Sequence, residues 1–292
     1  MERATTHDEV HMREDEIGSL AEAAEAEFMY QYESTASPAT KRALGIATAR
    51  MGGGVCLSVR HDVTGYWSKA LGFGVTEPVT EELVDELVAF YLAEKAPGAV
   101  IQIAPARLPE DWPEICRRHG LTPTSPWIKL VGAVDYVQMS HTTDLSIRPV
   151  DACDYPLWAS TALRGFGMPT DGLSDMLAEA LAHPGFRPFA AWDGDEMVAA
   201  ANLFVHGPVG SLNATATLDT HRNRGAQSAL IAARAKEAAN AGCRWLCAET
   251  GKPGDGEVNP SLTNLVRSGL RPLYERQNWA WSPGGSTESE GS

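Results

Sequence analysis

A short basic loop containing a glycine joins a strand-like run to a helix at residues 217–228. Arg222, Arg224 and Gly225 lie in this loop, and residues 226–240 after it contain neither Gly nor Pro and are rich in good helix formers. The loop should therefore lie at a helix N-terminus, where unpaired backbone N–H groups and the helix dipole favour a phosphate. Gly225 would let a ligand approach the backbone closely, so a bulky residue there should abolish binding. The stretch predicts an anion-binding cradle, although many helix starts carry Gly and Arg only as a turn and a solvated charge.

Composition and charge limit the partners that the chain can have. Its 292 residues are 43% hydrophobic, which is enough for two domains of ordinary size or one large one. The formal net charge of −14 argues against nucleic acid as a partner and would suit a cationic substrate. No apolar run is long enough to span a membrane, and the polar, acidic start is unlike an ordinary signal peptide. We therefore expect a cytoplasmic protein with no membrane partner.

The cysteines are odd in number and scattered, and they show no zinc-ligand spacing. We expect buried free thiols and no metal site. The five are Cys56, Cys116, Cys153, Cys243 and Cys247.

The local patterns predict an alternation of helices and strands in which the order of elements occurs twice. Thr80 is a plausible N-cap of a helix, the Asp193-Gly194 pair predicts a tight hairpin, and residues 38–51 are predicted to be helical. Each half has two helices, two or three strands, a long helix, a strand, a short helix and a last strand. This predicts a pseudo-repeat of about 140 residues that arose by duplication.

Residues 145–281 resemble the GNAT family of acyl-CoA-dependent N-acetyltransferases. The family's pyrophosphate signature, Arg/Gln-x-x-Gly-x-Gly/Ala, is matched by Arg222-Asn223-Arg224-Gly225-Ala226-Gln227, with Gln227 departing at the last position. A helix opening at Ser228, a strand over residues 244–250 and a helix after Asn259 follow in the family's order.

The resemblance implies an α/β (α+β) fold with two GNAT-like domains, each a mixed, mostly antiparallel sheet flanked by helices. It also implies acetyl-CoA (coenzyme A) as the cofactor, with its pantetheine arm in a gap between two splayed strands and its diphosphate on the loop. The expected cofactor-binding residues are Thr217, Leu218, Arg222, Asn223, Arg224, Gly225, Ala226, Gln227, Ser228, Asn259 and Ser261. Helix capping is an equal alternative for Asn259 and Ser261.

The resemblance also assigns catalytic roles. A backbone N–H near Leu218, left unpaired by the gap, would polarise the thioester carbonyl. Glu249 follows an apolar strand and would be the base, or it only caps a loop. The family's Tyr acid is replaced by Leu265, which leaves Tyr274 as the nearest phenol, although strand packing also explains it. Trp158, Phe166, Met168 and Trp192 could shape the acceptor pocket or be core.

The first half resembles the same fold without its site. Residues 72–82 lack a basic residue where the loop should be, and Glu81 and Glu82 would repel a phosphate at the helix start. We predict a degenerate domain at 1–140, a catalytic domain at 141–281 and a disordered tail at 282–292. The predicted enzyme moves an acetyl group from acetyl-CoA to a primary amine of a small molecule by direct attack. The alternatives are a non-catalytic acyl-CoA-binding or regulatory module and a protein N-acetyltransferase.

Overall fold

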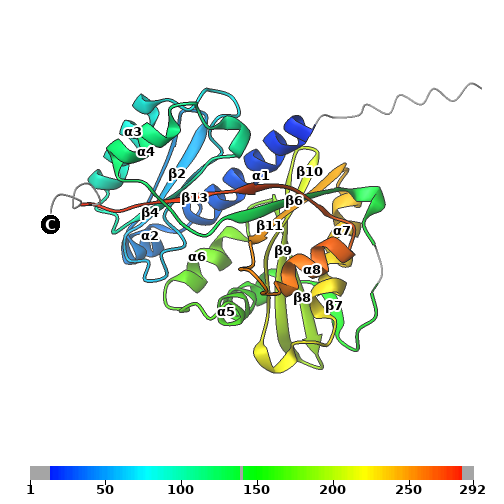
Figure 1. Cartoon of the computed structure of the whole chain (residues 1–292). Coiled ribbons are helices and arrows are strands. Elements are labelled where there is room, and N and C mark those ends of the chain that lie inside the picture. The colour runs from blue at the N-terminus through cyan, green and yellow to red at the C-terminus, as the bar shows by residue number, and fades with distance from the viewer. Residues whose placement is uncertain (1–13, 139–140, 285–292) are drawn as a thin grey trace, which may run out of the picture.

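The computed structural model describes residues 14–138 and 141–284 of the chain (Figure 1). The predicted tail at 282–292 and the loose N-terminal segment expected from the sequence lie mostly outside these residues. Within them, two β-sheets are flanked by helices, as the resemblance implied.

The first sheet has six strands and is mixed. In spatial order the strands are β1 (Ile46–Met51), β2 (Gly54–Val59), β3 (Lys69–Leu71), β4 (Ala99–Gln102), β13 (Asn278–Trp281) and β5 (Thr122–Pro123). Only β3 and β4 pair in parallel; the other neighbours are antiparallel.

The second sheet has seven strands and is also mostly antiparallel. In spatial order they are β12 (Arg271–Arg276), β6 (Trp127–Ala133), β11 (Trp245–Gly251), β10 (Val209–Thr217), β9 (Glu196–His206), β8 (Phe186–Asp193) and β7 (Ser146–Pro149). Its one parallel pair is β10 with β11.

The helices cover the faces of these sheets. They are α1 (Glu14–Ser34), α2 (Pro38–Leu44), α3 (Glu81–Ala93), α4 (Trp112–His119), α5 (Tyr155–Gly165), α6 (Leu173–Ala180), α7 (Ala226–Asn240) and α8 (Pro260–Arg267). Figure 1 shows α1 running between the two sheets, and it contacts β1 and β2 of the first as well as β9 and β10 of the second. Tyr32 of α1 packs against Trp67 on one side and Phe186 on the other, so one core joins both halves.

The two halves exchange strands. β6 comes from the first half of the chain and lies between β11 and β12, whereas β13 comes from the C-terminal end and lies between β4 and β5. Because β12 pairs with β6 and β13 pairs with β5, residues 122–133 and 271–281 run antiparallel to each other across both sheets. The predicted division between residues 140 and 141 therefore separates the sequence halves but not the sheets.

Most local predictions agree with the structure. Thr80 caps α3 by accepting a hydrogen bond from the N–H of Leu83 at 3.3 Å. The helix predicted over residues 38–51 is wrong beyond Leu44, because Gly45 adopts a left-handed conformation (φ 66°) that ends α2. Residues 46–51 then pair with β2 as a strand.

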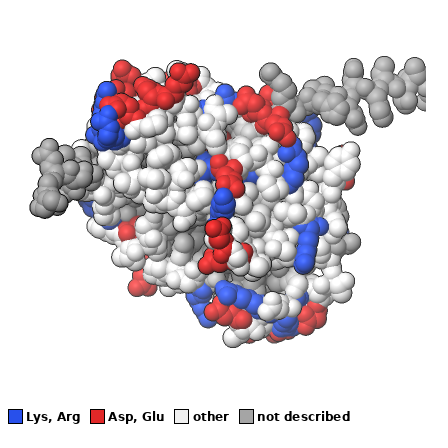
Figure 2. Space-filling view, viewed as in Figure 1, with Lys and Arg blue, Asp and Glu red and all other residues white. Residues whose placement is uncertain are grey.

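The surface carries charges of both signs (Figure 2), and most of the thiols lie inside the protein. On the face in Figure 2, Lys and Arg side chains are scattered among Asp and Glu. Four of the predicted buried thiols are buried, but Cys153 is exposed. None of the helices within the described ranges is long and apolar enough to cross a membrane.

Candidate active site

A gap opens between β10 and β11, where the resemblance placed one. The two strands pair over Val209–Leu212 and Trp245–Ala248 only. Beyond these residues β10 pairs with β9 alone and β11 pairs with β6 alone. A bulge in β10 lies between Asn213 and Ala216, and Ala214 within it has a positive φ of 49°. The bulge bends β10 away from β11 and so widens the gap between these two strands.

A cavity of about 390 Å³ passes through this gap. On one face of the sheet α7 and α8 line it, with Gln227, Ile231 and Leu265 among their side chains. On the other face it reaches α1, α5 and the start of β6. The cavity therefore connects the two faces of the sheet between the unpaired edges of β10 and β11.

The predicted pocket residues divide into two groups. Phe166 and Met168 line the cavity, as predicted. Trp158 and Trp192 do not line it and belong to the core; the indole N–H of Trp158 donates to the carbonyl of Phe189 at 3.0 Å. Tyr66 and Trp127, which the sequence did not single out, line the cavity from the first half of the chain.

The basic loop forms the start of α7. Gly225 is its N-cap with a φ of 79°, Asn223 has a φ of 65°, and none of the side chains that the structure describes caps the helix. The first N–H groups of α7, which include those of Ala226, Gln227 and Ser228, therefore have no side-chain cap. This arrangement suits a diphosphate bound by backbone N–H groups.

The two arginines of the loop differ from the prediction. Arg224 is held by two carboxylates, Asp144 and Asp193, each at 2.5 Å, so its charge is already neutralised. It fixes the loop to the segments around β7 and β8. Arg222 is more than half exposed and pairs with Asp219 at 2.7 Å. The guanidinium of Arg224 was expected to attract a diphosphate, but its two carboxylate partners leave it without excess positive charge.

Gln227, the departure from the family signature, connects two helices. Its side-chain amide donates to Ser261 at 3.0 Å and accepts from Asn264 at 2.7 Å, both on α8. Asn259 caps α8 by accepting from the N–H groups of Ser261 and Leu262, and it also donates to the end of β11. The side chain of Gln227, larger than the Gly or Ala of the family signature, thus points toward α8 along the cavity wall. Helix capping accounts for the position of Asn259.

The backbone donor assigned to Leu218 is not free. Its N–H donates to the carbonyl of Val198 on β9 at 2.9 Å. Because successive N–H groups of a strand point to opposite sides, the N–H of Thr217 points toward the gap instead. The N–H of Leu218 itself is therefore not available as the polarising donor, and the N–H beside it that faces the gap is that of Thr217.

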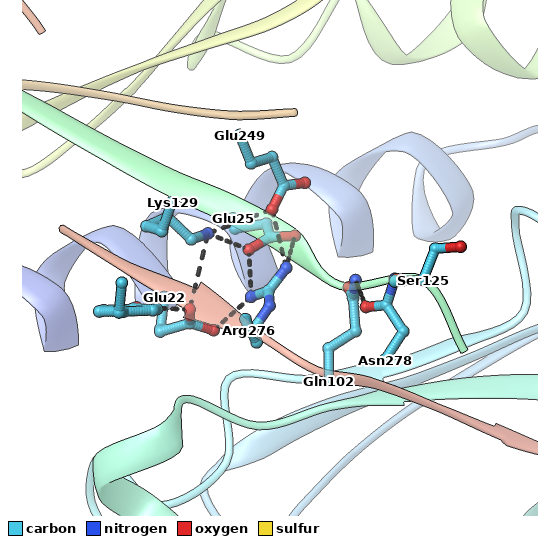
Figure 3. Close-up of polar contacts among 9 residues, drawn as sticks. Glu22, Glu25, Gln102, Ser125, Lys129, Glu249, Arg276 and Asn278 are labelled. Atoms are coloured by element: carbon cyan, nitrogen blue, oxygen red, sulfur yellow. Dashed lines mark hydrogen bonds and ion pairs between the residues drawn. The ribbon is translucent and has the colours of Figure 1, made fainter. Parts of the chain in front are cut away.

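Glu249 belongs to a buried cluster of charges (Figure 3). It lies on β11, lines the cavity, and accepts hydrogen bonds from Arg276 at 2.7 Å and Lys129 at 3.3 Å. Glu25 of α1 binds the same two cations, and Glu22 accepts from Arg276 at 2.6 Å. Three carboxylates thus share two cations.

Two acids of the cluster, Glu249 and Glu25, have pKa values shifted in opposite directions. Burial, and then the neighbouring carboxylate of Glu25, raise the pKa of Glu249 to about 7, and Lys129 and Arg276 offset this only in part. Burial opposes ionisation of Glu25 too, but Arg276 and Lys129 hold its pKa well below the usual range. Glu249 can therefore exchange a proton near neutral pH while Glu25 stays charged.

Comparison with known proteins agrees with this geometry. Residues 155–256 match the family model described as the acetyltransferase (GNAT) family. The chain carries a GNAT acetyltransferase domain. This match supports acyl transfer, the general activity of the GNAT family, for that domain.

Solved structures share the fold of the chain beyond the matched domain. A GCN5-related N-acetyltransferase from Kribbella flavida is 15% identical with a TM-score of 0.60, covering 91% of this chain and 96% of its own. A tandem GNAT protein from the clavulanic acid biosynthesis pathway is 12% identical with a TM-score of 0.58, covering 94% of each chain. A GCN5-related N-acetyltransferase from Sphaerobacter thermophilus is 14% identical with a TM-score of 0.55, covering 70% of this chain and 69% of its own. No curated protein matches by sequence.

The first half of the chain supplies cavity and cluster residues that the sequence did not predict. Lys129 sits in the otherwise apolar strand β6, and Glu22 and Glu25 face inward from the Ala-rich helix α1. A lone charge in a buried strand and acids three residues apart on one helix face were the available signals. They become a site only because strand exchange places β6 beside β11.

Tyr274 does not reach the cavity of the GNAT domain. Its hydroxyl donates to Glu22 at 2.7 Å, and its side chain lines a separate hollow beside Gly18. Leu265 occupies the cavity wall at the position of the family's Tyr. The prediction that Tyr274 protonates the leaving thiolate is therefore unsupported by the geometry.

We expect Gly225→Ala to weaken coenzyme A binding by about tenfold, because the left-handed φ is strained for Ala and the new Cβ would lie 2.9 Å from the carbonyl oxygen of Thr142. The sequence had suggested that a larger residue would block the approach of the ligand to the backbone. In the structure the added methyl group would instead push against Thr142 and distort the loop. Gly242→Ala is the matched control, since Gly242 has the same φ of 79° and open space around its Cβ position. Calorimetric titration of both variants checks this, and equal affinities would contradict it.

Proposed function

We propose that this GNAT protein transfers an acetyl group from acetyl-CoA to a primary amine of a small molecule by direct attack. The observation that supports the proposal most is the carboxylate of Glu249, whose pKa is about 7, on the wall of a cavity in the gap between β10 and β11. A base of that pKa can remove a proton from an ammonium group at neutral pH.

In this proposal, residues on both faces of the second sheet take part in binding and catalysis. The N–H groups at the start of α7 bind the diphosphate, and the N–H of Thr217 pairs with the pantetheine arm. The thioester supplies the activated acyl group. Glu249 accepts one proton from the ammonium, the freed amine forms the C–N bond as the C–S bond breaks, and a second amine proton leaves with sulfur as the thiol. This proton balance needs no phenol at the position of Leu265.

The walls of the cavity support a small acceptor. α1, α5 and α6 line the face of the sheet where Glu249 points, and aromatic side chains such as Tyr66 and Trp127 reduce the space there. A cavity of about 390 Å³ suits a small amine better than a folded protein surface.

We also propose that residues 1–140 bind no cofactor. The start of α3 is already capped by Thr80, and its first turn carries Glu81 and Glu82. Arg118, which comes close to that turn, is already bound to Glu81 at 2.5 Å. Negative charge at a helix start disfavours a phosphate.

The test combines calorimetry with an amine-panel assay. Acetyl-CoA should bind once per chain, and primary amines should release free thiol from it. No binding at millimolar acetyl-CoA would refute the proposed function. Two binding sites per chain would refute the proposal that residues 1–140 bind no cofactor. Binding without thiol release across a broad panel would favour a non-catalytic acyl-CoA-binding module.

The rate should depend on pH through Glu249. A carboxyl group must be ionised to accept a proton, and the pKa of Glu249 is raised to about 7, so the base is lost as pH falls below that value. We expect kcat/KM to fall about tenfold per pH unit below pH 7 and to level off above it. A profile that stays flat from pH 5 to 8 would exclude Glu249 as the base.

A further inference from the structure

Arg234 of α7 is fully buried and lines the cavity, yet within the described part of the chain its hydrogen bonds go to backbone carbonyls and not to a carboxylate. Its Nε donates to the carbonyl of Leu230 at 3.0 Å, and its Nη1 donates to the carbonyls of Asn202 at 2.8 Å and Asn213 at 3.4 Å. Across residues 14–138 and 141–284, Nη2 has no hydrogen-bond acceptor and the guanidinium forms no ion pair with a carboxylate. A cationic donor therefore remains unused on the cavity wall.

An uncompensated buried cation costs much more free energy than a paired one. Arg276 is equally buried but binds three carboxylates, Glu22, Glu25 and Glu249. Burial lowers the pKa of Arg234 to about 9, which still leaves it charged at neutral pH. The cavity therefore carries a positive charge that the described part of the chain does not neutralise.

A structural role explains the hydrogen bonds of Arg234 but not its charge. The carbonyls of Asn202 and Asn213 belong to the pair beside the bulge of β10, where the ladder with β9 is interrupted. A neutral amide on α7 could donate to the same carbonyls. The charge and the unused Nη2 call for an anionic group that enters the cavity.

The position of Arg234 indicates which part of a ligand it would meet. Gln227, Ile231 and Arg234 recur on one face of α7 along the cavity. Arg234 lies nine residues beyond Gly225, which is about 14 Å along the helix axis from the loop proposed to hold the diphosphate. It therefore faces the far end of an acyl donor that enters along α7.

We propose that Arg234 binds a carboxylate group of a reacting ligand. Because Arg234 lies on the face of α7 along which the acyl donor would enter, the acyl donor is favoured as the ligand that carries this carboxylate. The inference rests on the proposed acyl transfer and refines it: the preferred donor would be the coenzyme A thioester of a dicarboxylic acid. An acceptor that carries both an amine and a carboxylate is the other source of the same chemistry. Arg234 would then set the specificity of the site.

The experiment compares ligands that differ only in charge. Succinyl-CoA and butanoyl-CoA have acyl chains of four carbons, and phenylalanine and phenylethylamine form the acceptor pair. With wild-type protein we expect at least about tenfold tighter binding of succinyl-CoA than of butanoyl-CoA by calorimetry, and a similar preference in kcat/KM. Arg234→Met should reduce that ratio to near one, and Arg234→Lys should retain part of it.

Separate outcomes distinguish the two sources and overturn the idea. A preference for phenylalanine that is lost in Arg234→Met, with no preference among donors, would place the carboxylate on the acceptor. Wild-type protein that prefers neither charged ligand would overturn the proposal, even if Arg234→Met does not fold. Because calorimetry needs no turnover, absence of acyl transfer would refute the proposed function while the affinity ratio still tests Arg234.

Discussion

Replacing Glu249 with glutamine is expected to lower kcat by about 10²–10⁴-fold while affinity for acetyl-CoA stays unchanged. Glutamine keeps the size and the hydrogen-bond acceptor but cannot take a proton from the ammonium. The pH dependence below pH 7 should disappear together with the rate. Steady-state kinetics from pH 5 to 9, with calorimetric affinity for acetyl-CoA, measure both effects.

Glu257→Gln provides the control for Glu249. Glu257 is an exposed carboxylate in the segment between β11 and α8, where it accepts from the N–H of Gly254. Its replacement should leave kcat and the pH profile as in the wild type. Full activity of Glu249→Gln would assign Glu249 a purely structural role.

Removing the buried cation Lys129 is expected to lower the free energy of unfolding by about 3–5 kcal/mol. Lys129→Met leaves Glu25 and Glu249 with Arg276 as their shared cation, inside an interior where carboxylates are poorly solvated. Urea unfolding followed by circular dichroism measures the loss. Any folded variant should also require a higher pH for activity, because a cation that lowers the pKa of Glu249 is gone.

Lys252→Met is the matched control for Lys129. Lys252 pairs with Glu275 at 2.7 Å on the surface, where both side chains are substantially exposed. Its loss should cost less than about 1 kcal/mol. Adding Glu25→Gln to Lys129→Met should recover part of the stability, since it removes a carboxylate left short of cations. Equal stability of the Lys129 and Lys252 variants would contradict a buried network.

The sequence predicted features that depend on neighbours along the chain. α7 begins after the glycine-containing loop and extends over the run of helix formers, and α8 begins at Pro260, as the sequence indicated. The Asp193-Gly194 hairpin joins β8 to β9 as expected. The segment at residues 46–51 failed because its residues suit a helix or a strand equally, and pairing with β2 decided between them.

Features that depend on distant segments escaped prediction. Arg224 was expected to attract a phosphate because nothing local shows that Asp144 and Asp193 neutralise it. The bulge in β10 determines which N–H groups face the gap, and a one-residue irregularity changes that assignment from Leu218 to Thr217. Glu249 was identified from its own strand, but its tuning by Glu25 required knowledge of how α1 packs.

The reciprocal position of β6 and β13 also dictates an order of events during synthesis. When a ribosome has released only the first half of the chain, the sheet built on β1–β5 still lacks the strand that separates β4 from β5. That strand, Asn278–Trp281, is among the last described residues to be made. Neither sheet can be completed until residues 271–281 have been translated, so the two halves should fold together and not one after the other, as independent domains do.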